Sequence, residues 1–241
     1  MSLTPLTTFP AVRIGTERML LREFGPGDSA DLANVIAARE WEALPPGSPR
    51  EAIAMARWLR EKAHRFRLDG LGVHLAIVDP AGGYLGCTSL FNPDWTRGRI
   101  ETGSGLRSTA RGRGYITEIL HAVTHWVLTE GGMRRIELKT PLDNHASHRV
   151  AEKVGFVKEA TILEPTTAEE MVLYVREAAT SGYTRERAPL IRPEEGPAPG
   201  GWGYLSVLAT AKVASNSSMS SWPRAISEKS DGVWPPPEAS V

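Results

Sequence analysis

The stretch "LRSTARGRGYITEIL" at residues 106–120 places an Arg-Gly-Arg-Gly run between a short apolar segment and an apolar-periodic one. A strand is expected to end near Leu106 and a helix to begin close to 112–115, where the first helical N–H groups have no intrahelical acceptor. The helix dipole favours an anion there, glycine lets it approach the backbone, and Arg111 and Arg113 can donate charged hydrogen bonds. The junction therefore predicts either an anion site or a turn that simply needs glycine, and both alternatives stay open at this point.

The segments before the junction predict one strand and two helices. "ERMLLREF" at 17–24 is typical of a strand, and a helix with Asp28 as its N-cap candidate follows. "SPREAIAMARWLREKAHRFRLDG" predicts the best-marked helix, in which Ser48 is the expected N-cap, Glu51 completes a capping box and Gly70 provides the stop.

The remaining elements restrict the fold class. Runs at 73–79, 84–92 and 99–106 are joined by short connections, which favour antiparallel pairing. After them the sequence predicts a long helix with Ile116, Leu120, Val123 and Val127 on one stripe, a strand at 134–140, a helix at 143–154 and a strand at 171–175. This order predicts a single mixed α/β domain at about 10–177.

The composition changes after residue 177. The segment 178–241 is rich in Pro, Gly and Ser, which predicts a mostly disordered tail. Within it, 201–214 has enough apolar content to dock, so the tail is either an unselected extension or an element that docks to a partner or to the chain itself.

Charge and composition exclude several classes of function. Lys+Arg and Asp+Glu are 28 each, so the basic surplus of a nucleic-acid binder is missing. No apolar run approaches a membrane span, and the N-terminus does not resemble a signal peptide, so we expect a cytoplasmic protein without a membrane partner. Cys87 is the single cysteine, and His121 and His125 have the i, i+4 spacing without a third ligand, so no metal site is expected. A homodimer stays open.

Two motifs resemble the GNAT superfamily of N-acetyltransferases: "RGRGYITEIL" after an antiparallel strand, and later "DNHASHRVAEKVGF". The closer likeness is to the branch of the ribosomal-protein alanine N-terminal acetyltransferases, which opens with a pattern like "TERMLLREF" and carries Asn-x-x-Ser-x-x-Val-x-x-Lys-x-Gly-Phe. The residues that fit the second pattern are Asn144, Ser147, Val150, Lys153, Gly155 and Phe156. The resemblance covers about 10–177 and implies one α/β domain, with a mixed, mostly antiparallel sheet whose central strands splay apart and are flanked by helices.

The resemblance also implies acetyl-CoA as co-substrate. Its pyrophosphate would lie on the backbone amides of Arg111, Gly112, Arg113 and Gly114, and its pantetheine arm would pair with the backbone near Leu106. Gly103 and Gly105 suit the bulge that the splayed strands require, and a weakened strand end is the alternative. Asn144 would bind the pantetheine amide, or it is only a helix cap.

Two positions depart from the family pattern. Ile116 stands where a small residue is usual, and it either narrows the cofactor groove or points into the core. Ala151 stands where many relatives have a tyrosine that protonates the leaving thiolate. Ser147 is the substitute that the closer branch suggests, through a hydrogen bond to the sulfur.

Glu101 is the candidate general base, acting directly or through water. The alternative is a solvent-facing strand residue paired with Arg99 or Arg134. Acetyl transfer by direct attack in a ternary complex needs no enzyme nucleophile, so Cys87 is expected to be a core residue.

The acceptor would be a primary amine, on a protein N-terminus or a small molecule. Carboxylates and an aromatic residue near its expected position would suit a cationic amine, but such residues can equally form a solvated loop. They are Trp41, Glu42, Glu164, Glu169 and Glu170. A non-catalytic acyl-CoA-binding module and a protein that interacts through its tail are the competing functions.

Overall fold

The computed structural model describes residues 7–165 and 167–178, which belong to one compact unit. In chain order its strands (β), α-helices (α) and short 3₁₀ helices (η) are β1 (Arg13–Gly15), β2 (Leu20–Glu23), η1 (Pro26–Asp28), α1 (Ser29–Ala37), η2 (Trp41–Ala43), α2 (Ala52–Glu61), α3 (Arg65–Leu68), β3 (Gly72–Val78), β4 (Tyr84–Asp94), β5 (Arg99–Leu106), η3 (Ser108–Ala110), α4 (Tyr115–Leu128), β6 (Arg135–Pro141), α5 (His145–Val154), β7 (Val157–Leu163) and β8 (Glu170–Glu177).

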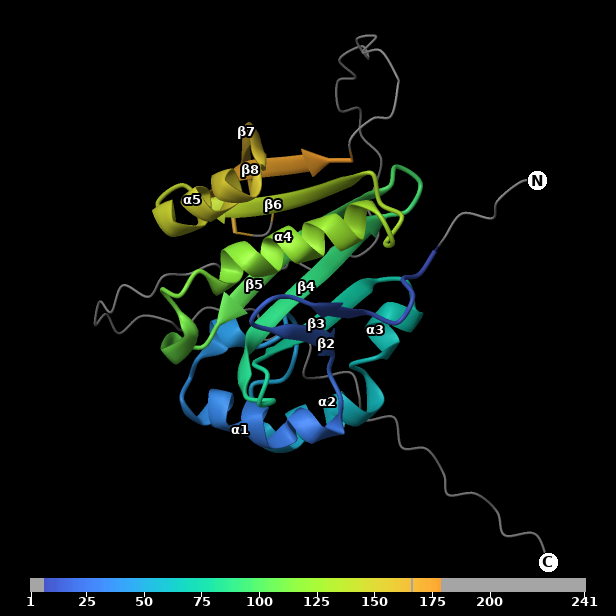
Figure 1. Cartoon of the computed structure of the whole chain (residues 1–241), viewed down its shortest axis with the longest axis vertical. Coiled ribbons are helices and arrows are strands. Elements are labelled where there is room, and N and C mark those ends of the chain that lie inside the picture. Colours follow the sequence, from blue (N-terminus) through green and yellow to red (C-terminus); the bar gives the residue numbers. More distant parts are fainter. Residues whose placement is uncertain (1–6, 166, 179–241) are drawn as a thin grey trace, which may run out of the picture. The chain divides into compact units, whose positions relative to one another are not determined.

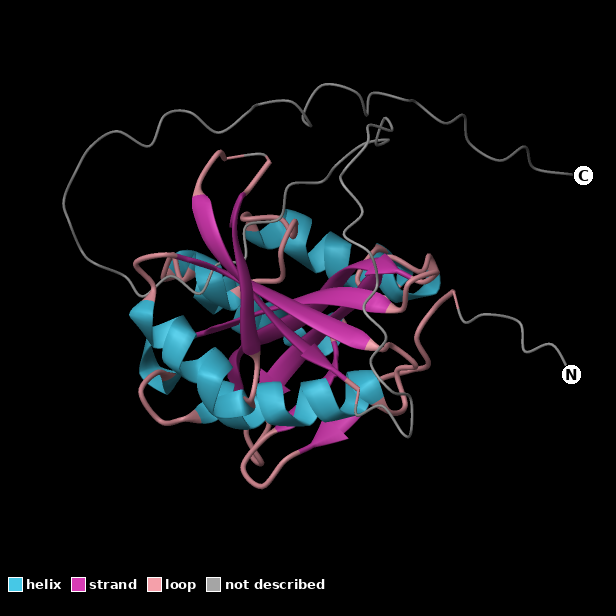
Figure 2. Cartoon of the chain, turned by 90° about the horizontal axis from the view of Figure 1, so that it is seen from above, coloured by secondary structure: helices cyan, strands magenta, loops and turns pink. Residues whose placement is uncertain are grey.

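The strands within the described residues form one sheet in the order β1-β2-β3-β4-β5-β6-β8-β7 (Figure 1). Neighbouring strands are antiparallel except β5 and β6, which are parallel. Helices cover both faces of the sheet (Figure 2). The prediction of a single mixed, mostly antiparallel α/β domain is confirmed.

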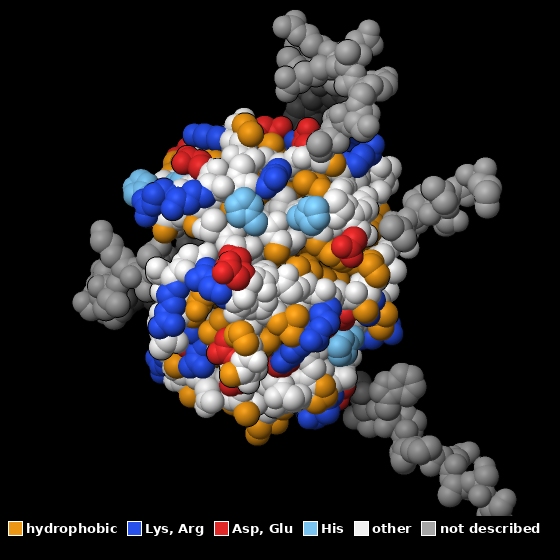
Figure 3. Space-filling view, in the orientation of Figure 1, with side chains coloured by type: hydrophobic (Ala, Val, Ile, Leu, Met, Phe, Trp, Pro, Cys, Tyr) orange, Lys and Arg blue, Asp and Glu red, His pale blue; other side chains and the backbone are white. Residues whose placement is uncertain are grey.

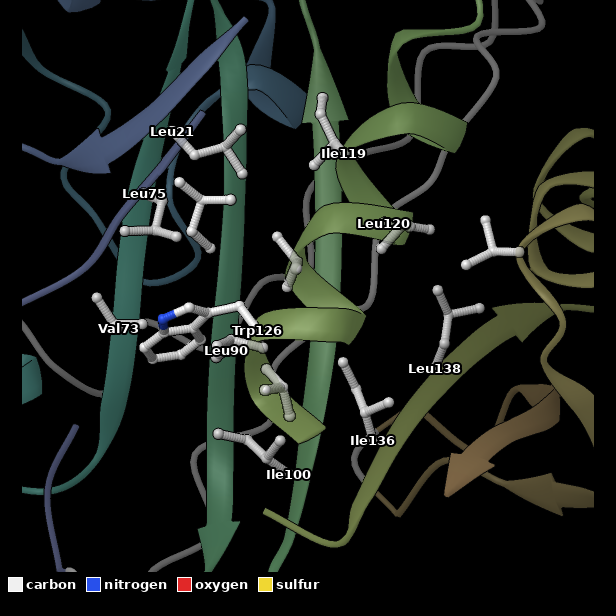
Figure 4. Packing of buried hydrophobic residues seen from close by; sticks show 14 of the residues in the cluster. Leu21, Val73, Leu75, Leu90, Ile100, Ile119, Leu120, Trp126, Ile136 and Leu138 are labelled. Atoms are coloured by element: carbon white, nitrogen blue, oxygen red, sulfur yellow. The ribbon is translucent and has the colours of Figure 1, made fainter. Parts of the chain in front are cut away.

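The larger part of the core lies between the sheet and α4 (Figure 4). Ile119, Leu120 and Trp126 of α4 pack against strand residues such as Leu75 and Leu90, and all five are buried. The predicted stripe of α4 is therefore largely right, although the first fully buried residue of the helix is Ile119 and not Ile116, which is partly buried. We call this side of the sheet the α4 face.

The opposite side of the sheet, the α1–α2 face, has a second apolar cluster. Leu32 and Val35 of α1 and Met55 and Leu59 of α2 pack there together with sheet residues that include Cys87. Successive residues of a strand point to opposite faces of the sheet. Ile100 and Leu106 of β5 belong to the α4 face, and the residues between them point in turn to one face and to the other.

One of the two predicted helix starts is wrong. α2 begins at Ala52, with Glu51 as its N-cap, because the Glu51 carboxylate accepts hydrogen bonds from Ile53 N (3.4 Å) and Ala54 N (3.2 Å). Ser48 Oγ instead is buried without a hydrogen-bond partner in the described part of the chain. Asp28 is the N-cap residue of α1, as predicted, but its carboxylate pairs with Arg22 at 2.6 Å and makes no capping hydrogen bond to this helix.

Two edge strands, β1 and β7, were not predicted from the sequence. β7 is mostly exposed, so its sequence "VKEATIL" carries no clear apolar alternation that could reveal a strand. The predictions for the tail, including 201–214, concern residues outside the described ranges, and the domain boundary at 177 stays a prediction. None of the helices in the described ranges has the length and apolar character that a membrane crossing requires.

Candidate active site

The two parallel strands at the centre of the sheet separate partway along their length. Their ladder has three pairs and ends at Glu101↔Glu137, but β5 continues to Leu106 and β6 to Pro141. We call residues 102–106 and 138–141 the splayed segment. In Figure 4, Ile100 and Ile136 lie near the closed end, Leu138 lies farther from β5, and α4 crosses the strands. The splayed central strands implied by the resemblance are therefore present.

The bulge expected at Gly103 and Gly105 is not there. β4 and β5 pair regularly from Gly86↔Leu106 to Phe91↔Glu101, and the register shifts only between Phe91 and Asp94. Gly105 is needed for a different reason: a Cβ atom at this position would lie 1.7 Å from the carbonyl oxygen of Glu42, because η2 crosses β5 here.

The junction before α4 presents unpaired backbone N–H groups. Gly112 and Gly114 have positive φ angles of 74° and 77°, and α4 begins at Tyr115 as expected. Within the described ranges, the backbone N–H groups of 112–117 have no hydrogen-bond acceptor. The next N–H group along the chain, that of Glu118, donates to Gly114 O at 3.3 Å. No atom lies within 4 Å of a Cβ built on Gly112. This geometry suits an anion, as the first of the two sequence alternatives requires.

The arginines of the junction are placed differently from each other. Arg111 N donates to Ser108 O at 3.3 Å, and its guanidinium donates to Leu106 O at 3.0 Å and lies 3.5 Å from Glu42 Oε2. The side chain of Arg111 is therefore turned toward the end of β5, whereas Arg113 is exposed.

Arg18 is a residue of this junction that the sequence did not single out. Its guanidinium donates to Arg113 O at 3.1 Å, pairs with Glu118 at 2.6 Å and lies 4.6 Å from the centre of the Tyr115 ring. In the sequence, only the position of Arg18 inside the family-like pattern "TERMLLREF" could have indicated a role at this junction.

The N-terminus of α5 brings Asn144 and Ser147 together. Asn144 caps the helix, since its Oδ1 accepts a hydrogen bond from Ser147 N at 3.1 Å, and both residues are buried. Among the described residues, Asn144 Nδ2 and Ser147 Oγ have no hydrogen-bond partner. Ala151, one turn later, is fully buried in the core, and Ile116 packs half-buried against the same core.

Glu101 is paired, but with neither of the arginines considered from the sequence. Lys139 Nζ lies 3.0 Å from Glu101 Oε2, and Asn92 Nδ2 donates to Oε1 at 3.2 Å. Lys139 also lies 3.8 Å from Glu164. Sequence reasoning missed Lys139 and Asn92 because only the strand register brings them beside Glu101.

The other candidates are explained by their surroundings. Burial raises the pKa of the Cys87 thiol to about 12, so Cys87 is a core residue and a poor nucleophile, as expected. His121 and His125 of α4 are exposed. Figure 3 shows several histidine side chains (pale blue) at the surface, and the described residues contain no group of three ligands that could hold a metal ion.

Comparisons with known proteins agree with this geometry. The chain matches the acetyltransferase (GNAT) domain family over residues 18–157. No curated protein matches it in sequence.

Three solved structures illustrate the likeness in fold. They are ribosomal-protein-S5-alanine acetyltransferase from Vibrio fischeri (19% identity, 69% of this chain and 96% of that chain, TM-score 0.60), RimJ from Mycobacterium smegmatis in complex with CoA-disulfide (18%, 70% and 88%, 0.61), and spermidine N-acetyltransferase from Vibrio cholerae in complex with CoA and spermine (15%, 66% and 95%, 0.55). The chain belongs to the GNAT acetyltransferase family.

Proposed function

We propose that this protein transfers an acetyl group from acetyl-CoA to a primary amine, on a protein N-terminus or a small molecule, by direct attack in a ternary complex. The observation that carries the proposal is the splayed segment beside the unpaired N–H groups of 112–117. In the described part of the chain, the splayed segment provides a stretch of β5 that does not pair with β6, and the N–H groups of 112–117 provide donors for a pyrophosphate. Two of the similar structures were determined with CoA or its disulfide.

The residues around the junction fit the phosphate end of this co-substrate. The backbone amides of Gly112, Arg113 and Gly114 supply unpaired donors at a helix N-terminus. The Arg111 amide is already used by Ser108, so Arg111 would act mainly by fixing the end of β5 through Leu106 O. Ile116 packs against the core, which leaves the backbone of the first turn of α4 to the ligand.

The pantetheine arm would lie along the edge of β5 that faces β6 in the splayed segment, next to Leu106, whose carbonyl oxygen accepts a hydrogen bond from Arg111 Nε. Asn144 Nδ2 would donate to the arm, and this donor is available because the cap uses only Oδ1. Ser147 Oγ would donate a hydrogen bond to the sulfur when the thioester bond breaks, in place of the tyrosine that Ala151 replaces.

Glu101 would take the proton that the attacking amine gives up, directly or through water. The carboxylate stands at the closed end of the splayed segment, and Lys139 and Asn92 fix its two oxygens. The amine nitrogen forms the new bond to the carbonyl carbon while the bond from that carbon to sulfur breaks. Acetyl-CoA supplies the activated acetyl group.

The first test is acetyl-CoA binding by calorimetry to the wild type and to Gly114→Glu. A carboxylate at Gly114 would repel the pyrophosphate, so we expect at least about a tenfold loss of affinity. Gly82→Glu is the matched control, because Gly82 also has a positive φ angle (89°), and no atom lies within 4 Å of a Cβ built there. It introduces the same strain and charge away from the junction.

Affinity lost only in Gly114→Glu would support the site and justify assaying CoA release with a panel of primary amines. No binding by folded wild-type protein would refute the proposal. Tight binding without acetylation of any amine would favour the competing function, a non-catalytic acyl-CoA-binding module.

A further inference from the structure

The five residues that the sequence places near the acceptor, Trp41, Glu42, Glu164, Glu169 and Glu170, differ in their pairing and burial. The Trp41 ring lies under the guanidinium of Arg50 at 5.1 Å, and Glu42 is paired with Arg111. Glu169 and Glu170 are exposed. Glu164 alone among these acidic residues is more than nine-tenths buried, at 8% exposure.

Glu164 lies near Lys139, which pairs with Glu101 at the point where the ladder between β5 and β6 ends. Lys139 follows Glu137, the last paired residue of β6, by two positions, so both point to the same side of the strand. Ile136 and Leu138 belong to the core of the α4 face, which places Lys139 on the opposite side. The same alternation along β5 places Glu101 there, and the observed ion pair agrees with it.

The charges of this group do not balance. One ammonium, that of Lys139, serves both carboxylates, at 3.0 Å from Glu101 and 3.8 Å from Glu164. The Glu164 carboxylate accepts no hydrogen bond from the described residues, and 3.8 Å is too long for one.

The next arginines along these strands are engaged elsewhere. Arg99 pairs with Asp94 at 3.4 Å, and Arg135 pairs with Glu137 at 2.7 Å. Within the described residues, Lys139 is the one cation paired with Glu164, and a nearly buried carboxylate that shares its cation is costly unless another positive charge approaches it. Glu164 keeps 11% of its side-chain surface exposed, so a ligand can reach it.

We propose that Glu164 binds a positively charged group of the acceptor other than the reacting amine, so that the preferred acceptor carries two cationic groups a few bonds apart. This inference rests on the proposed function, since it takes Glu101 as the residue beside the reacting amine. Lys139 is a positioning residue, because it holds the two carboxylates close enough to serve one acceptor.

The test compares two amines that differ by one charge, 1,4-diaminobutane and n-butylamine. Their affinities for the full-length protein saturated with CoA are measured by calorimetry. We expect the diamine to bind about tenfold more tightly, which is the size of one charge-assisted hydrogen bond. Glu164→Gln should remove that difference, and Glu169→Gln, a neutralised carboxylate in the same loop, should keep it.

A second variant should change the affinity for the diamine in the opposite direction. Lys139→Gln leaves both carboxylates without their cation, so the diamine should bind more tightly to it than to the wild type, and n-butylamine should change less. Thermal unfolding verifies that each variant is folded.

Equal affinities of the two amines for the wild type would overturn this inference, as would a preference for the diamine that survives Glu164→Gln. Both results leave acetyl-CoA binding, and with it the proposed function, intact. Failure of CoA itself to bind would instead overturn the proposed function and this inference together.

Discussion

The side chain of Asn144 uses only half of its hydrogen-bonding capacity inside the protein. Its Oδ1 caps α5 by accepting from Ser147 N, whereas its Nδ2 has no partner among the described residues. The two roles considered from the sequence, helix cap and pantetheine ligand, are thus compatible, because they use different atoms.

Two substitutions at this position separate the roles. Asn144→Asp keeps a capping oxygen and removes the N–H donors, so we expect stability within about 0.5 kcal/mol of the wild type and an affinity for acetyl-CoA that is about tenfold lower. Asn144→Ala should lose both the affinity and about 1 kcal/mol of stability. Urea unfolding and calorimetry measure the two quantities, and wild-type affinity in Asn144→Asp would show that Asn144 is only a cap.

At the scale of elements, η2 is fastened to the end of β5 and to the loop that follows it. Glu40 accepts hydrogen bonds from Ser108 N at 2.8 Å and from Arg107 Nε at 2.9 Å. Burial by itself raises the pKa of Glu40, but the hydrogen bonds from Ser108 and Arg107 outweigh it, so the pKa lies below its ordinary value. Gly105 completes the contact, because only glycine leaves room for the Glu42 carbonyl.

This contact predicts that alanine is tolerated at Gly103 but not at Gly105 of the same strand. Gly105→Ala should destabilise the protein by about 2 kcal/mol, since its Cβ would lie 1.7 Å from Glu42 O and η2 would have to move. Gly103→Ala is the control, because its Cβ would meet only the Phe91 ring at an ordinary contact of 3.5 Å. Urea unfolding of both variants measures the effect, and equal stabilities would show that η2 is free to shift.

At the scale of the whole molecule, the buried His74 makes folding depend on pH. Its Nδ1 lies 2.8 Å from Ser89 Oγ, and its ring stacks on Phe66 at 4.2 Å. Burial lowers its pKa from 6.5 to about 3. Between these values the unfolded chain binds a proton that the folded protein does not, so the free energy of unfolding falls as the pH falls.

We expect the wild type to lose on the order of 2 kcal/mol between pH 7 and pH 5, at about 1.4 kcal/mol per unit below 6.5. Carboxylates such as Glu40, whose pKa is lowered, contribute only nearer their ordinary pKa of 4.5 and below it. His74→Gln should flatten the dependence, and His125→Gln, at an exposed position, should keep it. Urea midpoints at the two pH values provide the measurement, and a wild-type stability that does not change would contradict this role of burial.

Much of the fold followed from local pattern. β5 begins and ends at the predicted residues, and α4 begins at Tyr115 as the glycines of the junction indicated. The helix start at Asp28 was right, but the start at Ser48 was wrong, because several residues near a helix start can cap it and here Glu51 does. β7 escaped prediction because an exposed edge strand needs no apolar alternation.

The family, the order of the elements and the glycine-rich junction could be predicted from local sequence, since they depend on residues that are neighbours along the chain. The partners of Glu101 and the burial of Glu164 depend instead on tertiary contacts. Lys139, Asn92 and Glu164 come from three other segments. Asn92 follows Phe91, which pairs with Glu101 from β4, and Lys139 is two residues after Glu137, which pairs with Glu101 from β6. Strand register and burial set such charge contacts, and neither is encoded in the spacing of the residues that make them.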